Sequence, residues 1–324
     1  MDKTLHISDA FLEYIKEVEY RYQMNGKPLG LSTGIDRLDE RLGYIRGGDV
    51  VLIAGRPAMG KTAFAINCVY QVAQKIKEEA EQNNSEMKQI LYFDFECNNK
   101  NMMQRFVSLA SGTPLYELRH DIENYKQFEK IAFTSKKINQ LPIYLCNQIS
   151  SISDIKDKIY AFANRNKLGL VVIDYLQLLS LYSEDKSNQA YKKFMQDIKS
   201  IAEKLDVPIL ILSQLNRNLE QRQCKIPINS DIKGGYRNIV PYADKLLFLY
   251  REHYYIYDEE PKQYKRETKE HFEKRYKERQ EDCQEQENKC EIIIAKNNNG
   301  SCGWIKCLFD RDIGKFSNLE EDCF

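Results

Sequence analysis

The segment Gly55–Thr62, GRPAMGKT, places two glycines, a lysine and a threonine at the spacing G-x-x-x-x-G-K-[ST] of a phosphate-binding P-loop. Gly55 and Gly60 allow a turn so tight that successive N–H groups converge on one phosphate, at the positive end of the following helix. Lys61 then reaches the β- and γ-phosphates, and the Thr62 hydroxyl takes one position on Mg²⁺. The residues predicted to bind the nucleotide here are Gly55, Arg56, Pro57, Ala58, Met59, Gly60, Lys61, Thr62 and Ala63.

Two acidic positions complement this loop. The run Ile90–Glu96, ILYFDFE, is predicted to be a strand, on which Asp94 and Glu96 share a face because they lie two residues apart. A carboxylate at this position can orient and deprotonate the water that attacks the γ-phosphate, and Glu96, nearer the strand end, is the predicted catalytic base. The run Leu168–Leu179 carries four apolar residues into Asp174, which is typical of a Walker B strand whose carboxylate holds Mg²⁺. Thr62 and Asp174 are therefore the predicted metal ligands.

A third strand-like run, VPILILSQ, ends in the polar pair Ser213 and Gln214. The Gln214 amide at a strand end can contact the γ-phosphate and relay its loss. The alternative is a strand-end amide that only satisfies backbone groups.

The alternation of apolar strands and amphipathic helices over residues 50–250 predicts an α/β fold. Its sheet should be mostly parallel with helices on both faces, and the nucleotide should lie at the carboxyl ends of the strands. Helices are expected over residues 36–42, 62–80, 98–140, 150–166 and 190–206, the fourth of these opened by a serine or aspartate cap.

The amino-acid composition limits the kinds of partner that the chain can bind. Among 324 residues, Lys+Arg and Asp+Glu both number 48, so any nucleic acid must be held by local loops or by a channel formed on assembly. No apolar run approaches the ~20 residues of a membrane span, and no signal peptide opens the chain, which predicts a cytoplasmic protein without a membrane partner. Nine cysteines without a C-x-x-C pair fit reduced thiols. The four histidines fall outside every motif and receive no role.

Residues 8–24 carry Phe11, Ile15, Val18 and Tyr22 on one helical face. This stripe must be buried either on the chain's own domain or on a neighbouring subunit, and helix periodicity does not distinguish the two.

In order, these motifs resemble the DnaB-type replicative DNA helicases, which are RecA-like P-loop NTPases. The matching strings also include ADKLLFLYREHYY and CEIIIAKNNNG, and the resemblance runs from about residue 8 to residue 318. It implies a homo-hexamer that hydrolyses ATP at subunit interfaces and moves along single-stranded DNA with 5′-to-3′ polarity to unwind the duplex in replication. A helicase loader or primase is an implied partner. The resemblance assigns phosphate and Mg²⁺ to Lys61 and Thr62, the base to Glu96, the Walker B acid to Asp174 and the sensor to Gln214.

The resemblance also divides the chain. Residues 1–27 match a linker helix that docks on the adjacent subunit, and residues 28–324 match the ATPase domain, with a charged helical insertion at about residues 252–290. Glu270–Lys274 and Glu273–Lys277 are at a favourable helical spacing for ion pairs there. The amino-terminal domain of the family is expected to be absent.

Two further departures concern function. The family motif K-x-R-N-G supplies an arginine finger across the interface, and here Lys296 matches but Asn298 replaces the arginine. Arg311 substituting, Lys296 acting alone, and slow hydrolysis are the open alternatives.

The family's DNA-facing loop reads DIKGGYRN here, residues 231–238. The residues predicted to contact DNA are Lys233, Gly234, Gly235, Tyr236 and Arg237, which provide charge, close backbone approach and a stacking ring. The alternative is a loop whose charges face water.

Two rival functions stay open beside the helicase. One is a RecA-like DNA-binding ATPase without processive unwinding. The other is a slow-turnover nucleotide-binding adaptor of another helicase, which Asn298 suggests.

Overall fold

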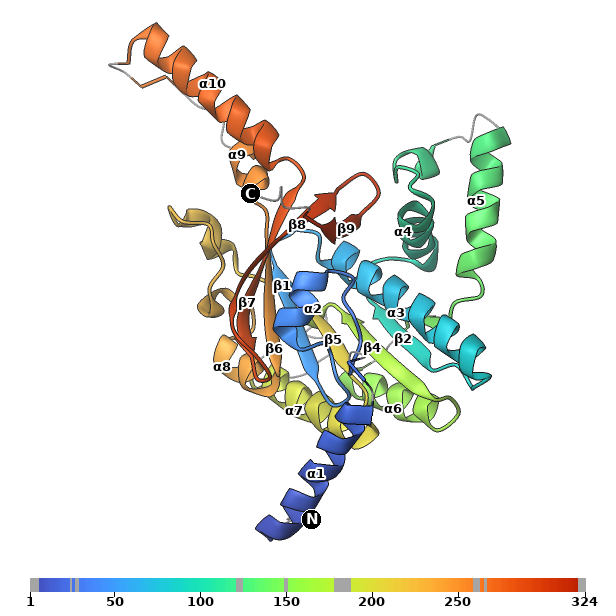
Figure 1. Cartoon of the computed structure of the whole chain (residues 1–324). Helices are drawn as coiled ribbons and strands as arrows, with labels where there is room; N and C mark the ends of the chain where they lie inside the picture. The colour runs from blue at the N-terminus through green and yellow to red at the C-terminus, as the bar shows by residue number, and fades with distance from the viewer. Residues whose placement is uncertain are drawn as a thin grey trace.

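A nine-stranded sheet forms the centre of the chain, with the strand order β3-β2-β4-β5-β1-β6-β7-β8-β9 (Figure 1). The computed structural model describes residues 6–23, 25–26, 29–120, 125–148, 151–177, 188–258, 263–264 and 267–319. The strands are β1 (Val50–Gly55), β2 (Gln89–Asp94), β3 (Ile143–Cys146), β4 (Leu168–Asp174), β5 (Ile209–Gln214), β6 (Lys245–Tyr250), β7 (Lys289–Asn297), β8 (Gly303–Asp310) and β9 (Lys315–Asn318). The pairs among β1–β6 are parallel, whereas β7 pairs antiparallel with β6, β8 with β7 and β9 with β8. The prediction of a mostly parallel sheet is confirmed.

Helices cover both faces of this sheet. They are α1 (Ile7–Gln23), α2 (Asp36–Leu42), α3 (Lys61–Asn83), α4 (Asn99–Ser111), α5 (Tyr125–Ile138), α6 (Ile152–Ala163), α7 (Asn188–Leu205), α8 (Tyr236–Ile239), α9 (Glu252–Asp258) and α10 (Lys269–Gln286). Short 3₁₀ turns are η1 (Glu117–Arg119), η3 (Arg217–Gln221), η4 (Asn229–Asp231) and η5 (Val240–Tyr242). Within the described ranges, no helix is long and apolar enough to cross a membrane.

Strand β1 shows why the sheet needs helices on both sides. Alternate residues of a strand point to opposite faces. Val51 and Ile53 pack with α2, α3 and α4, whereas Val50 and Leu52 pack with α6, α7 and α8. All six residues of β1 are buried, as expected for a parallel strand between two helical layers.

Local sequence signals set several helix boundaries. Ser151 begins α6 with a capping box, in which its hydroxyl accepts from the Asp154 N–H and the Asp154 carboxylate accepts from the Ser151 N–H. The predicted serine cap is therefore confirmed. The prediction for the second strand was too long, because β2 ends at Asp94 and Glu96 lies beyond it. The two acids therefore do not share a strand face.

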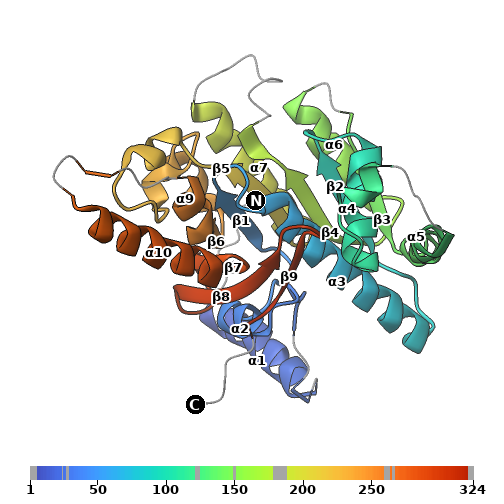
Figure 2. The ribbon, with the colours of Figure 1, turned by 90° about the horizontal axis from the view of Figure 1, so that it is seen from above.

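Two helices extend from the body of the domain. In α1, Phe11 is 58% and Tyr22 is 87% exposed, whereas Ile15 is half-buried, so the described residues leave most of the predicted apolar stripe uncovered. Helix α10 has no buried residue, and it lies at the opposite end of the molecule from α5 in both views (Figures 1 and 2).

The charged region before β7 forms α9 and α10, and β7 begins at Lys289. Its ion pairs differ from those expected: on the described part of this region, Lys274 pairs with Glu278 and Lys277 with Glu281. Several positions within the segments predicted from sequence lie outside the described residues: 1–5, 24, 27–28, 121–124, 150, 178–179, 259–262, 265–266 and 320–324.

Candidate functional site

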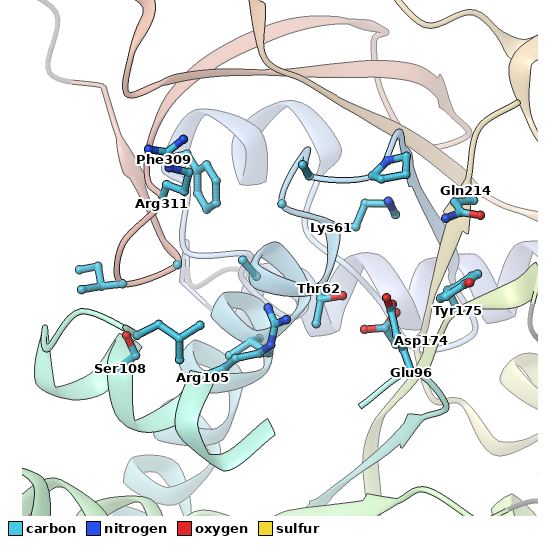
Figure 3. A pocket seen from close by; sticks show the side chains of 18 residues that line it. Lys61, Thr62, Glu96, Arg105, Ser108, Asp174, Tyr175, Gln214, Phe309 and Arg311 are labelled. Atoms are coloured by element: carbon cyan, nitrogen blue, oxygen red, sulfur yellow. The ribbon is translucent and has the colours of Figure 1, made fainter. Parts of the chain in front are cut away.

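A pocket of about 360 Å³ lies at the carboxyl ends of β1, β4 and β5, where the parallel strands deliver their last residues to one edge. Of the predicted site residues, Pro57, Ala58, Gly60, Lys61, Thr62, Ala63, Glu96, Asp174 and Gln214 line it. Figure 3 shows Thr62, Asp174 and Glu96 together on one side, with Phe309 and Arg311 on the other.

The P-loop has the strained shape that its glycine permits. Gly60 has a φ of +90°, and an added Cβ would lie 3.1 Å from the ring carbons Cζ of both Phe309 and Phe316. Lys61 begins α3 directly after it, so the positive end of a 23-residue helix faces the pocket. The Lys61 ammonium donates to the carbonyl of Arg56 at 3.0 Å, and burial lowers its pKa to about 8. The loop is thus arranged around a cation that can turn to a phosphate.

Three predicted P-loop residues are not among those that line the pocket. The Arg56 side chain donates to Glu220 Oε1 from Nε at 2.8 Å and to the carbonyl of Leu215 at 2.8 Å. Met59 is buried in the core, and a Cβ added at Gly55 would lie 3.2 Å from the carbonyl oxygen of Leu249. Any contribution of these residues to ligand binding must come from their backbone.

Asp174 is the most deeply buried acid of the site, at 2% exposure. Burial raises its pKa to about 7, against the opposing effect of a hydrogen bond from the Thr62 hydroxyl. The Tyr92 hydroxyl donates to its Oδ2 at 3.1 Å. The two predicted metal ligands are therefore in contact at the pocket floor.

Asp94 and Glu96 have separate surroundings. Asp94 is buried, and its Oδ1 accepts the backbone N–H groups of Glu96 and Cys97, each at 3.0 Å. It therefore shapes the turn after β2. Glu96, carried on that turn, is exposed and lines the pocket.

The oxygen donors at the pocket suit Mg²⁺, a hard cation that takes few protein ligands alongside water and phosphate oxygens. The Asp174 carboxylate and Thr62 hydroxyl are such donors, and they touch. Over the described ranges, no group of three or more His, Cys, Asp or Glu side chains is arranged to hold a metal.

Comparison with known proteins shows the family to which the chain belongs. Residues 30–318 match the model of the DnaB-like helicase C terminal domain. This chain belongs to the DnaB-like helicase family. It is 31% identical over 310 residues to the replicative DNA helicase DnaB of Rickettsia bellii (strain RML369-C), covering 95% of this chain and 61% of that protein. It is 30% identical over 318 residues to the Geobacillus stearothermophilus replicative DNA helicase DnaB, covering 97% of this chain and 62% of that protein.

Two solved structures share the fold of this DnaB-like chain. One is an isolated ATPase domain, which superposes with a TM-score of 0.75 at 26% identity, covering 97% of this chain and 99% of that one. The other is a DnaB-like replicative helicase, described with its interactions with primase. It superposes with a TM-score of 0.75 at 27% identity, covering 98% of this chain and 68% of that one. The chain spans 61% to 62% of the length of the curated relatives named above.

Gln214 occupies the pocket edge predicted for it in this DnaB-like domain. Its backbone N–H donates to the side-chain Oε1 of Gln177 at 2.7 Å. Gln177 had no role in the sequence interpretation. No local spacing marks it, because its partners lie 36 to 56 residues away.

Arg105 also lines the pocket, and the sequence interpretation missed it. It comes from α4, and its buried Nε has no hydrogen-bond partner among the residues that the structure describes. Met102 and Phe106 on either side of it are buried in the core. The sequence did carry one signal for Arg105, which is an arginine between two core positions of an amphipathic helix. A charge placed there indicates a site, because it needs a partner.

The turn between β8 and β9 closes the opposite side. Phe309 stacks on Phe316 with centroids 4.4 Å apart, and the Arg251 guanidinium lies 4.9 Å from the Phe309 ring centroid. Arg251 also donates to the carbonyl of Ala58 in the P-loop at 3.1 Å. Arg311, considered above as a substitute finger, lines the pocket of its own chain.

Lys296 is not brought into this pocket. It pairs with Leu246 near the start of β6, whereas the P-loop follows the end of β1, which runs parallel to β6. Its ammonium donates to the carbonyls of Val240 at 3.1 Å and Ala243 at 2.6 Å. A catalytic role for Lys296 therefore requires a second subunit.

The segment over residues 231–238, called the loop below, leaves the sheet beside β5. It was predicted to be a loop throughout, but Tyr236 and Arg237 belong to the short helix α8. Lys233, Tyr236 and Arg237 are exposed. Gly234 has a φ of +101°, and an added Cβ there would lie 2.9 Å from the Tyr191 ring. The glycine is thus required by packing within the chain, and a contact of this loop with DNA stays a prediction.

Proposed function

We propose that this chain is the motor domain of a replicative DNA helicase, which hydrolyses ATP to move 5′-to-3′ along single-stranded DNA and unwind the duplex. The observation that carries the proposal is the pocket at the carboxyl edge, where Lys61, Thr62, Asp174 and Glu96 converge in a chain of the DnaB-like family. The four side chains supply a phosphate cation, two Mg²⁺ ligands and an exposed base.

The roles follow from the surroundings of each group. Mg²⁺, when bound, would supply positive charge that offsets the charge developing on the phosphates. Thr62 and Asp174 would hold it, and Lys61 would exchange the Arg56 carbonyl for phosphate oxygens. Glu96 would orient and deprotonate the attacking water, because it faces the pocket from a turn that Asp94 fixes. Gln214 would contact the γ-phosphate from the end of β5.

The exposed side chains of the loop over residues 231–238 would hold the DNA strand. Lys233 and Arg237 supply charge for phosphates, and Tyr236 a ring for a base.

Assembly into a homo-hexamer would complete the motor. The exposed stripe of α1 would dock on the adjacent subunit, with residues 1–27 as a linker and residues 28–324 as the ATPase domain. Lys296 would act on a neighbour's pocket only after giving up its bonds to the carbonyls of Val240 and Ala243. A primase or loader is a proposed partner, supported by the related helicase described with primase.

Steady-state ATP hydrolysis, with and without oligo-dT, is the first test. The unaltered chain should be stimulated by DNA. Lys61→Ala should lose ~10²–10³-fold in turnover, since it removes a donor aimed at developing phosphate charge. Lys75→Ala, which removes a lysine 39% exposed in its side chain on the same helix, is the matched control.

Strand displacement from a 5′-tailed fork separates the helicase from its rivals. DNA-stimulated hydrolysis without displacement would favour a DNA-binding ATPase that does not unwind. Nucleotide binding with almost no hydrolysis would favour an adaptor, and no nucleotide binding would overturn the proposal.

A further inference from the structure

Gln177 lies three residues after the Walker B acid Asp174 and is 5% exposed. Its side-chain amide bonds to two different segments. Nε2 donates to the Ser213 hydroxyl and to the carbonyl of Lys233, both at 2.8 Å, and Oε1 accepts the backbone N–H of Gln214 at 2.7 Å. One buried side chain therefore joins the ends of β4 and β5 to the loop over residues 231–238.

Backbone hydrogen bonds tighten the same junction. The Lys233 N–H donates to the Gln214 carbonyl at 3.1 Å, and Leu215 forms an isolated antiparallel bridge with Ile232. The Asn216 N–H donates to the Asp231 carbonyl at 2.7 Å. The chain leaving β5 and the start of the loop thus form one short paired unit, and Gln177 anchors this unit to β4.

The two ends of this unit face different surroundings. Gln214 lines the nucleotide pocket, together with Asp174 and Tyr175 from the β4 side. The side chains of Lys233 and of Tyr236, the first residue of α8, are exposed. The distance between pocket and loop is therefore spanned by a single layer of hydrogen-bonded groups.

A buried amide with both donors and its acceptor engaged resists partial displacement. If Gln214 moves toward a γ-phosphate, the bond from its N–H to Gln177 must break or the Gln177 amide must follow. If the amide follows, its bond to the Lys233 carbonyl shifts as well, because an unpaired buried polar group is unfavourable. The same geometry works in reverse when a ligand moves the loop.

We propose that Gln177 is a positioning residue that transmits the occupancy of the nucleotide pocket to the backbone of the loop over residues 231–238. The inference rests on the proposed function in one respect, that a nucleotide occupies the pocket beside Gln214.

Hydrogen–deuterium exchange of the full chain, with and without AMP-PNP and Mg²⁺, tests this without requiring DNA. In the unaltered protein the nucleotide should slow exchange at residues 55–62 and change it at residues 231–238 by at least threefold. Gln177→Met, which keeps the length but removes the polar atoms, should retain the effect at 55–62 and lose that at 231–238. Gln196→Met, which removes an exposed amide bonded to the Tyr242 hydroxyl, should retain both.

Two additional variants test the proposal even if Gln177→Met does not fold. Ser213→Ala removes one of the three hydrogen-bond partners described above and should weaken the response of the loop without abolishing it. Gln177→Glu keeps an acceptor for the Gln214 N–H but loses the donor to Lys233, and should uncouple the loop as Gln177→Met does. A second readout is the ratio of fluorescein-oligo-dT affinities with and without AMP-PNP, which should fall at least fivefold toward one in Gln177→Met.

The outcomes separate the two ideas. If AMP-PNP leaves residues 55–62 unchanged in the unaltered chain, the proposed function and the inference both fail. If residues 55–62 are protected but 231–238 do not respond, or still respond fully in folded Gln177→Met or Gln177→Glu, only the inference is overturned.

Discussion

Asn298 is bound to Asp244 through both its backbone and its side chain. The Asn298 N–H donates to the Asp244 carbonyl at 3.0 Å, and its Nδ2 donates to Oδ1 at 3.2 Å. Asp244 also pairs with Lys199 at 2.8 Å. The residue at the position where the family resemblance implies an arginine finger is therefore held against its own domain.

This engagement predicts a gain from Asn298→Arg. Asn298 is neutral and Lys296 is bonded to two carbonyls, so neither position presents a free cation at the β7–β8 turn. An arginine there should raise DNA-stimulated ATP turnover by at least ~10-fold, a small part of the ~10³–10⁵ found for arginine fingers elsewhere. Asn299→Arg, the same charge one residue along, should change turnover little. Equal turnover in all three proteins would mean that another residue already supplies the cation.

Arg105 should matter for catalysis although no motif marks it. Its guanidinium lines the pocket, and its buried Nε has no hydrogen-bond partner within the described ranges, so it is available to charge that develops on a phosphate. Arg105→Gln should lower kcat for ATP by on the order of 10²-fold, as for other preorganised donors. Arg165→Gln, at an exposed position just after α6, is the control. A change of less than threefold in kcat would show that Arg105 is not used in the reaction.

The uncovered stripe of α1 should control assembly. Phe11 and Tyr22 are exposed within one chain, and burying such surface contributes ~25 cal/mol per Å². Phe11→Asp should therefore shift the molar mass from oligomer to monomer at micromolar protein, measured by light scattering with ATP and Mg²⁺ present. Lys16→Asp adds the same acid away from the stripe and should leave the mass unchanged. An unchanged mass for Phe11→Asp would remove α1 from the interface.

The ion pair between Lys245 and Asp49 should be costly to break on one side. Lys245 is 0% exposed at the start of β6, and Asp49 precedes β1. Asp49→Asn leaves the ammonium buried without a counter-charge and should lower the free energy of unfolding by ~3–5 kcal/mol. Urea unfolding at neutral pH measures it. The double change Asp49→Leu with Lys245→Met should recover most of that loss, and failure to do so would indicate that packing rather than charge dominates.

The local sequence pattern was sufficient to predict most of the fold. Runs such as Val50–Gly55 and Leu168–Asp174 are apolar on both strand faces, so they require a parallel sheet between helices wherever they lie. The P-loop and the Ser151 cap depend on groups a few residues apart. For the same reason Lys61, Thr62, Asp174 and Glu96 could be chosen as site candidates from their immediate neighbours in the chain.

Relationships between distant segments were decided only by the tertiary structure. The order β2-β4-β5-β1 places Gln177 beside Lys233, 56 residues away. Helix α4 brings Arg105 to the pocket that the P-loop lines, although the P-loop lies far before it in the chain. The antiparallel return of β7 carries Lys296 away from its own pocket, and the β8–β9 turn carries Arg311 into it. Periodicity fixes how each segment folds and which face it buries, but which side chains meet depends on strand order and register, which no local spacing encodes.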